Sequence, residues 1–318
     1  MNDRFGREIT YLRISVTDRC NLRCKYCMPA SGVELKKHEQ MLTEEEMITA
    51  VSILTDMGVK KVRITGGEPL IKKNILSILE KIRRIQGVET LAITTNGVLL
   101  GEKADTLRQI GVNSINISLD TLNEKKYSDI TRGGNLQNVI GSIKKALSLG
   151  FDKVKINSVL IGGFNDDEIE DLAKLTMKYP LDVRFIELMP MPEIYDFGEK
   201  AYLPADMILK KINGLEELPQ RPGDTAKLFR LKNSLGKIGI ISPVTGCFCD
   251  SCNRIRITSD GYVKPCLHSK DEYIIKGLSP SEMRAKFIEA LNSKNEKHAP
   301  LSYCSRSHSQ KTMNQIGG

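Results

Sequence analysis

The chain of 318 residues contains no tryptophan, only eight phenylalanines and nine tyrosines. Proteins that bind single-stranded nucleic acid stack the bases on aromatic side chains beside a basic surface. The aromatic residues here are scattered and do not alternate with a basic run, so the net charge of +8 gives little support to nucleic-acid binding. A basic balance equally fits a polyphosphate substrate, or solubility alone.

The sequence also lacks a long apolar run. No stretch approaches the ~18 apolar residues that a membrane-spanning helix needs, so we expect no membrane span. The chain opens Met-Asn-Asp-Arg-Phe-Gly-Arg-Glu, without an apolar signal region. We therefore expect a cytoplasmic protein, in a reducing compartment where cysteines rarely form disulfides.

Three cysteines lie close together near the amino terminus. Cys20, Cys24 and Cys27 form a C-x3-C-x2-C motif, which supplies three thiolates where an iron-sulfur cube normally takes four. One iron is left open, and it can hold a small molecule and pass it an electron. Zinc is the alternative, but the next histidine, His38, lies eleven residues beyond Cys27 in a polar stretch. The motif therefore favours redox catalysis.

The spacing, with the aromatic Tyr26 before the last cysteine, resembles the cluster loop of the radical S-adenosylmethionine family. The resemblance implies a 4Fe-4S cluster whose open iron binds the amino and carboxylate groups of S-adenosylmethionine. It further implies reductive release of a 5'-deoxyadenosyl radical, which abstracts hydrogen from unactivated carbon. No side chain performs such chemistry alone.

Strand and helix patterns alternate over the first two thirds of the chain. Six apolar β-rich runs cover residues 11–16, 59–65, 91–95, 114–119, 154–160 and 183–188, and helical patterns are clearest over 43–57, 73–85, 136–149 and 167–178. Thr43 and Glu46 form a capping box, while Gly58 and Gly150 fit helix ends. Repeated strand-helix units predict a parallel sheet with helices outside.

Six units are too few for a closed eight-stranded barrel. We therefore predict an α/β fold with a partial (β/α)6 barrel of the TIM type, which the family resemblance also implies. A linker-like stretch, Pro-Gln-Arg-Pro-Gly-Asp at 219–224, precedes short strands and four more cysteines. We place a domain boundary there: residues 1–220 form the barrel, and residues 221–318 form an α+β domain that covers its open side.

Residues that leave the strands are candidates for chemistry, because barrels of this class hold their sites at the carboxyl ends of the strands. The first strand leads to Cys20, the second to Thr-Gly-Gly-Glu-Pro at 65–69, the third to 94–97 and the fourth to 118–120. Gly66 and Gly67 allow a close approach to backbone. The segment resembles the family's loop against the methionyl amino group.

A second trio of cysteines follows the linker. Cys249, Cys252 and Cys266 give C-x2-C-x13-C. One interpretation is a zinc ribbon completed by Cys247 or His268; the other is a second iron-sulfur cluster whose open iron binds substrate. Two alternate residues, Arg254 and Arg256, would share one face of a strand, where two-pronged guanidinium groups suit a nucleoside phosphate.

Together these motifs resemble the GTP 3',8-cyclase family of molybdenum cofactor biosynthesis, over segments 12–21, 64–69, 248–256 and 313–318. The resemblance assigns Cys20, Cys24 and Cys27 to the first 4Fe-4S cluster and Cys249, Cys252 and Cys266 to the second. It assigns Tyr26, Gly67, Ser118 and Met189 to S-adenosylmethionine, and Arg13, Arg63, Thr94, Lys155, Arg254 and Arg256 to GTP, the last two also as catalytic residues. The terminal Gly317-Gly318 pair resembles the family's tail, which reaches into the active site.

The implied reaction removes hydrogen from the ribose 3' carbon of GTP, and the resulting radical attacks guanine C8. The resemblance also implies an electron donor such as flavodoxin or ferredoxin and a following enzyme that takes the product. It is compatible with a homodimer. We expect neither a membrane nor a nucleic acid as partner. The rival enzyme is another twin-cluster radical protein that acts on a peptide or protein. The rival outside catalysis is a zinc-ribbon protein that binds nucleic acid.

Several residues fall outside these patterns. Cys247 lies two residues before the predicted ligand Cys249 and competes with it for the metal centre. We expect Cys304 to be an ordinary thiol in the tail. The histidines, His38, His268, His298 and His308, show no paired spacing for a metal. We expect them at the surface or in local hydrogen bonds.

Overall fold

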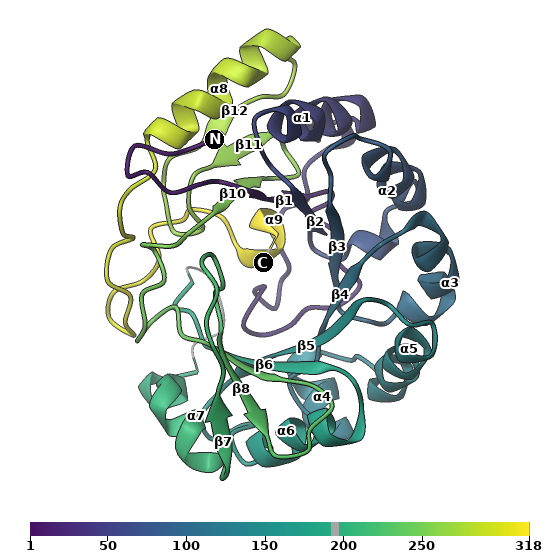
Figure 1. Cartoon of the computed structure of the whole chain (residues 1–318), viewed down its shortest axis with the longest axis vertical. Helices are drawn as coiled ribbons and strands as arrows, with labels where there is room; N and C mark the ends of the chain where they lie inside the picture. The colour runs from purple at the N-terminus through teal and green to yellow at the C-terminus, as the bar shows by residue number, and fades with distance from the viewer. Residues whose placement is uncertain (192–196, 318) are drawn as a thin grey trace.

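The computed structural model describes residues 1–191 and 197–317. Six strands pair in parallel in chain order: β1 (Tyr11–Ser15), β2 (Lys61–Thr65), β3 (Thr90–Thr95), β4 (Ser114–Ser118), β5 (Lys153–Leu160) and β6 (Asp182–Glu187). These are the six predicted strands, each within two residues of its expected ends. They form an arc with helices outside it (Figure 1).

The helices that follow or connect these strands are α1 (Glu44–Asp56), α2 (Ile75–Arg83), α3 (Leu100–Ile110), α4 (Glu124–Thr131), α5 (Leu136–Ser148) and α6 (Ile169–Lys178). The four helices with the clearest sequence pattern all form. The predicted capping box is present, because Thr43 Oγ1 accepts from the Glu46 amide and the Glu46 carboxylate accepts from the Thr43 amide. None of the helices in the described part of the chain has the length and apolar character to span a bilayer.

The remaining strands extend this sheet at both edges. They are β7 (Leu215–Glu217), β8 (Lys227–Leu231), β9 (Ile238–Ile241), β10 (Arg254–Ile257), β11 (Tyr262–Lys264) and β12 (Tyr273–Ile274), followed by α8 (Pro280–Asn292) and α9 (Met313–Ile316); α7 (Ala205–Lys211) precedes them. β9 pairs in parallel with β6, and β10 pairs in parallel with β1. Among the described residues, the strand order runs from β12 to β7 without closing, which confirms the partial barrel.

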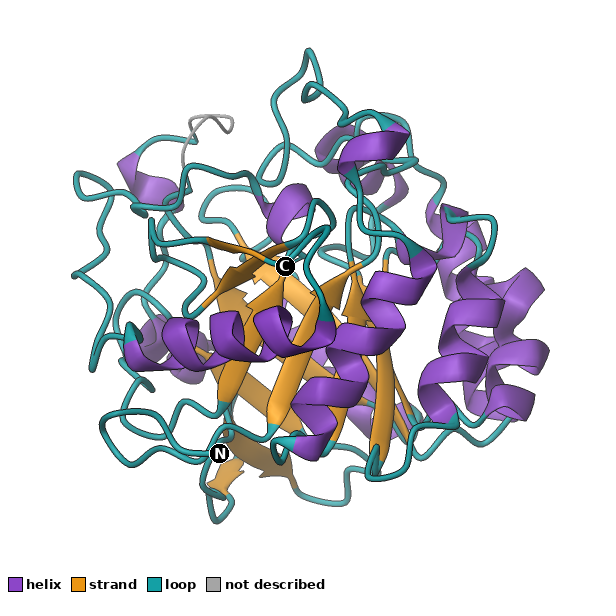
Figure 2. Cartoon of the chain, turned by 90° about the horizontal axis from the view of Figure 1, so that it is seen from above, coloured by secondary structure: helices purple, strands orange, loops and turns teal. Residues whose placement is uncertain are grey.

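The later segments contribute more to the barrel than the sequence predicted. With β9 and β10, eight strands of the described chain run parallel, where six were expected. In Figure 1 the green-to-yellow segments occupy the side that the arc leaves open. α9 lies within the arc, and Figure 2 places the two termini at opposite ends of the strands.

The apolar core lies between the sheet and the outer helices. Leu12, Ile14, Val62 and Ile64 are fully buried there. Alternate residues of the same strands, such as Arg13 and Arg63, point to the opposite face, because successive side chains of a strand alternate. The interior of the arc is therefore lined by polar and charged side chains, and the site described below lies there.

Candidate active site

The first cysteine trio lines a cavity of about 210 Å³ at the carboxyl ends of the barrel strands. Cys20, Cys24 and Cys27 follow β1 and are each half-buried. The same cavity is lined by Tyr26, Gly67, Ser118 and Met189, the set predicted for S-adenosylmethionine, and by Thr94. The fold thus brings residues from four strand ends around the first trio.

The Gly66-Gly67 pair packs against the backbone that leads into the cysteine loop. Gly66 has φ +151°, and a Cβ on Gly67 would lie 2.2 Å from the Arg19 carbonyl oxygen. The Gly67 amide donates to the Thr17 carbonyl at 2.8 Å. The close approach that these glycines permit is therefore first to the protein's own chain, and it holds the cysteine loop against the end of β2.

Two buried carboxylates brace the same loop. Tyr26 donates its hydroxyl to Asp120 at 2.7 Å, and burial raises the pKa of Asp120 to about 6. Glu68 accepts from the Thr95 hydroxyl at 2.8 Å and the Asn96 amide at 2.6 Å, while burial raises its pKa to about 7. These bonds tie the cysteine loop to the end of β4, and the end of β2 to the end of β3.

The sulfur atoms of the first trio are suited to a metal centre. Burial raises the pKa of the Cys27 thiol to about 12 and lifts the pKa of Cys24 well above its usual value. A buried thiol with a raised pKa becomes a thiolate when a metal supplies the compensating positive charge. Three such sulfurs from one loop, beside an open cavity, fit a cluster that keeps one iron free for a ligand.

The second cysteine trio lines an adjoining cavity of about 300 Å³. Eight lysine and arginine side chains surround it, against one carboxylate, that of Asp224, among its described lining residues. The basic residues are Arg13, Lys61, Arg63, Lys155, Arg184, Arg254, Arg256 and Lys294. Such an excess of positive charge suits a polyanion and disfavours an apolar or cationic ligand.

Three of these arginines form a row across neighbouring strands. Arg13 on β1 lies in register with Arg63 on β2 and with Arg256 on β10. Like charges directly opposite each other destabilise a sheet. Burial, together with Arg13 and Arg254, lowers the pKa of Arg256 to about 9. Repulsion within this row therefore destabilises the folded protein when no anion is bound. A bound anion would offset the repulsion.

The cationic field extends to the opposite wall. Lys155 on β5 is buried, and burial together with Arg184 lowers its pKa to about 7. Burial and then Arg63 lower the pKa of Arg184 on β6. An anion placed between these walls would raise the pKa of Lys155 and restore its charge.

Cys252 lies in a different electrostatic setting from the first trio. Burial alone raises the pKa of this thiol, but the charges of Arg254 and Lys294 outweigh it and hold the pKa at about 6. Lys294 is buried and donates to the carbonyls of Arg254 at 3.2 Å and Pro265 at 2.5 Å. A thiolate at neutral pH is the ligand form that iron requires, so Cys252 is suited to bind a cluster iron.

The two cavities adjoin, because Asn157, Ile186, Met189 and Met313 line both. The chain's tail enters here: the Gly317 carbonyl accepts from Arg256 Nη1 at 3.1 Å. Gly318, the other half of the predicted tail motif, lies outside the described residues. The geometry thus sets the two cysteine trios on adjoining cavities, with a basic wall around the second.

Comparison with known proteins adds to this geometry. Residues 14–176 match the model of the radical SAM superfamily, and residues 181–300 match that of Molybdenum Cofactor Synthesis C. The chain is 44% identical over 321 residues to a GTP 3',8-cyclase of Alkaliphilus oremlandii, with all of both chains covered. It is 43% identical over 320 residues to that of Clostridium botulinum strain Okra, again with full coverage. The chain belongs to the GTP 3',8-cyclase family of radical SAM proteins.

Solved structures support the fold of this family member. Streptococcus suis SuiB bound to S-adenosylmethionine superposes with a TM-score of 0.63 at 17% identity, over 82% of this chain and 61% of that one. A structure of anSMEcpe with bound AdoMet gives 0.59 at 15% identity, over 90% and 78%. At these identities the likeness concerns the partial barrel alone. Family membership implies S-adenosylmethionine and two 4Fe-4S clusters as cofactors, which fits the two thiol trios.

One predicted substrate residue, Thr94, lies apart from the others, and three basic residues that were not predicted, Lys61, Arg184 and Lys294, line the second cavity. Thr94 lines the first cavity, although Arg63 Nη1 reaches its hydroxyl at 3.4 Å. Sequence reasoning missed all three. The only sequence signal for Lys61 and Arg184 was a basic residue within an apolar strand, and Lys294 follows a helix without any motif.

The histidines lie at the surface or make hydrogen bonds, as expected, and two of them also lie beside the second trio. His268 is buried, and its Nδ1 lies 3.0 Å from the Ser307 hydroxyl. His298 lies beside Cys247 and Cys249. No spacing in the sequence signals this contact, because about 50 residues separate the histidine from these cysteines.

Proposed function

We propose that this protein is a lyase that converts GTP to (8S)-3',8-cyclo-7,8-dihydroguanosine 5'-triphosphate in molybdenum cofactor biosynthesis. One observation carries the proposal beyond family membership. A cavity walled by eight basic side chains adjoins the cavity of the first cysteine trio, so a nucleoside triphosphate held in the former presents its ribose toward the latter.

We assign the first cluster to Cys20, Cys24 and Cys27, and the S-adenosylmethionine site to Tyr26, Gly67, Ser118 and Met189. When bound, these cofactors supply a carbon radical that is able to remove the ribose 3' hydrogen. The protein's own contribution is placement. Asp120 orients Tyr26 through its 2.7 Å hydrogen bond, and the apolar shared wall of Ile186 and Met189 limits water between the cavities.

We assign the second cluster to Cys249, Cys252 and Cys266, where its open iron would bind the guanine base. Arg13, Arg63, Lys155, Arg254 and Arg256 would bind GTP, and Thr94 would act through Arg63. Lys61 and Arg184 join this set on the structural evidence that they line the same cavity. The triphosphate then relieves the mutual repulsion of the basic wall, which supports binding in one orientation.

The proposed boundary near residue 220 divides the chain by function, because strands from both sides of the boundary belong to one sheet. Residues 1–220 would hold the first cluster and S-adenosylmethionine. Residues 221–318 would hold the second cluster and the tail. We also propose a cytoplasmic location, an electron donor such as flavodoxin or ferredoxin, a following enzyme that takes the product, and a homodimer, which the mass measured in solution tests.

An anaerobic assay with GTP, S-adenosylmethionine and a reductant tests the function. We expect the cyclised nucleotide together with 5'-deoxyadenosine. Arg254→Ala and Arg256→Ala should weaken GTP binding and product formation while leaving S-adenosylmethionine cleavage measurable. Unchanged product formation by both variants would reject the assignment, and about eight iron atoms per chain without GTP retention would favour a protein-modifying radical enzyme.

A further inference from the structure

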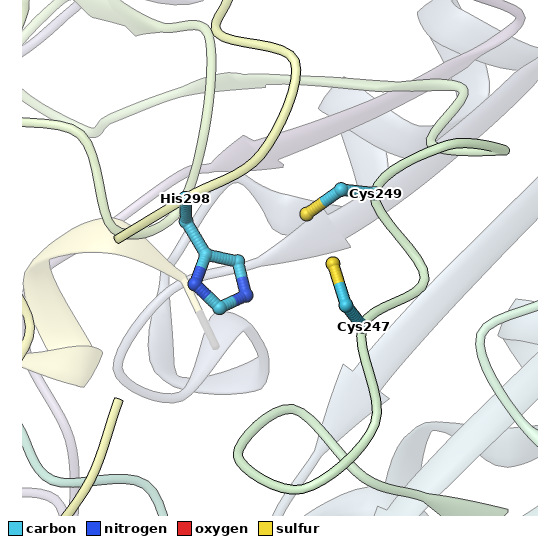
Figure 3. Close-up of side chains that lie close together, drawn as sticks. All are labelled: Cys247, Cys249 and His298. Carbon is cyan, nitrogen blue, oxygen red and sulfur yellow. The ribbon is translucent and has the colours of Figure 1, made fainter. Parts of the chain in front are cut away.

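A compact group of metal-binding side chains includes Cys247, which the family pattern leaves without a role. The sulfur atoms of Cys247 and Cys249 and a ring nitrogen of His298 lie within 4.8 Å of one another. Figure 3 shows the two thiols and the imidazole facing the same space. Cys249 is buried, His298 is half-buried and Cys247 is exposed, so an ion can reach the group from solvent.

The histidine is held in a ligand-ready form. His298 Nδ1 lies 2.7 Å from the Ala299 carbonyl oxygen, and because a carbonyl only accepts, Nδ1 carries the proton. The lone pair is then on Nε2, and the second ring nitrogen faces the two sulfurs in Figure 3. A backbone carbonyl that accepts from one ring nitrogen while the other binds metal is the usual arrangement of ligating histidines.

The spacing suits a single ion. Around one tetrahedral Zn²⁺, with Zn–S near ~2.3 Å and Zn–N near ~2.0 Å, the ligand atoms lie roughly 3.5–3.8 Å apart, so this group needs to close by about 1 Å. In a cube each thiolate binds a different iron, and the sulfurs stand further apart. Water is available as the fourth ligand, because Cys247 is exposed to solvent.

We propose that the cluster-free protein binds one Zn²⁺ through Cys247, Cys249 and His298, and that this zinc excludes the second cluster. The exclusion rests on the proposed function, because it requires Cys249 as a cluster ligand; the zinc site itself does not. The Cys249 sulfur cannot bind zinc and occupy its place on the cube at once. Zinc bound at this group therefore blocks assembly of the second cluster.

Zinc titration of the full-length apoprotein tests the site. Cys20, Cys24 and Cys27 are replaced by Ala so that the first trio takes no metal, and Zn²⁺ competes with a chromophoric chelator under reducing conditions. We expect one tightly bound ion per chain and, with Co²⁺, thiolate charge-transfer absorption. Cys247→Ser and His298→Ala should each weaken binding by more than the roughly 10–100-fold cost of losing an outer partner.

The matched controls are Cys304→Ser and His38→Ala, because both side chains are exposed and line none of the cavities around the cysteine trios. They should bind zinc as the parent protein does. Equal zinc affinity in the parent and in Cys247→Ser would overturn the proposed site, since the ion would then be held by other cysteines.

Iron reconstitution in the same background tests the exclusion. We expect about four irons per chain without zinc, almost none after zinc loading, and about four in Cys247→Ser with or without zinc. Zinc and four irons bound together would overturn the exclusion and remove Cys249 from the cluster ligands. If no second cluster forms even without zinc, the exclusion and the proposed function both fail, while the titration still decides the zinc site.

Discussion

Replacement of Arg256 by methionine tests whether the arginine row serves substrate binding. Arg256 lies in register with Arg13, and its pKa is lowered from 12.5 to about 9, by burial first and then by Arg13 and Arg254. At about 1.36 kcal/mol for each tenfold change, this corresponds to roughly 5 kcal/mol against the charged form. Solvent screening and relaxation make that an upper bound.

The substitution should change stability and affinity in opposite directions. Methionine keeps an apolar stem but loses the charge and the 3.1 Å hydrogen bond to the Gly317 carbonyl, a bond that contributes about 1 kcal/mol. We expect the cluster-free protein to gain about 1–2 kcal/mol in free energy of unfolding. GTP should bind about ten- to a hundredfold more weakly, because a hydrogen bond to a charged group is worth ~1.5–3 kcal/mol.

Anaerobic urea denaturation measures the free energy of unfolding, and equilibrium dialysis of the reconstituted protein measures GTP affinity. The repulsion is complete below the folded pKa of about 9 and declines as the pH rises above it, so the stability difference should narrow at high pH. Arg230→Met, on the exposed face of β8, is the control and should change neither quantity. A less stable Arg256 variant with unchanged GTP affinity would refute the reasoning.

Three further predictions concern other parts of the site. Burial and Arg184 lower the pKa of Lys155 to about 7, so the free energy of unfolding of the GTP-free protein should rise as the pH increases above 7. GTP binding near pH 8 should take up protons, because the bound anion raises this pKa. Calorimetry in two buffers measures the proton uptake, which Lys155→Met should abolish. Arg7→Ala leaves the buried Asp3 carboxylate without its ion-pair partner and removes the 2.9 Å bond to the Cys249 carbonyl. The free energy of unfolding should fall by about 3–5 kcal/mol, and iron content at the second trio should drop; full iron content would contradict this. Gly317→Ala places a Cβ 2.1 Å from Thr65 Oγ1 at φ +78°, and it should reduce formation of the cyclised product more than S-adenosylmethionine cleavage. The control Gly277→Ala has a similar φ of +75° but open space around it, and it should affect neither reaction.

The barrel strands were predictable because each is a short apolar run between helices with clear periodicity. β9 and β10 were not, because they are four residues each, and β10 pairs with β1, more than 200 residues earlier in the chain. A four-residue pattern cannot identify a partner at that distance, so the closure of the open side by parallel strands appears only in the fold.

The site shows a similar limit. The cysteine trios could be read from spacing, since ligands of a cluster come in short motifs. Arg13 and Arg63 came from the family resemblance, and Arg184 was missed, because a single basic residue in a strand is ordinary. The register of β1, β2 and β10 is what turns separate arginines into one row.

The central claim is that the second trio presents GTP while the first serves S-adenosylmethionine. Electron paramagnetic resonance of the reduced protein in which Cys20, Cys24 and Cys27 are replaced by Ala observes the second cluster alone. The account predicts that GTP shifts this signal and that S-adenosylmethionine leaves it unchanged. A signal that responds to S-adenosylmethionine and ignores GTP would contradict it.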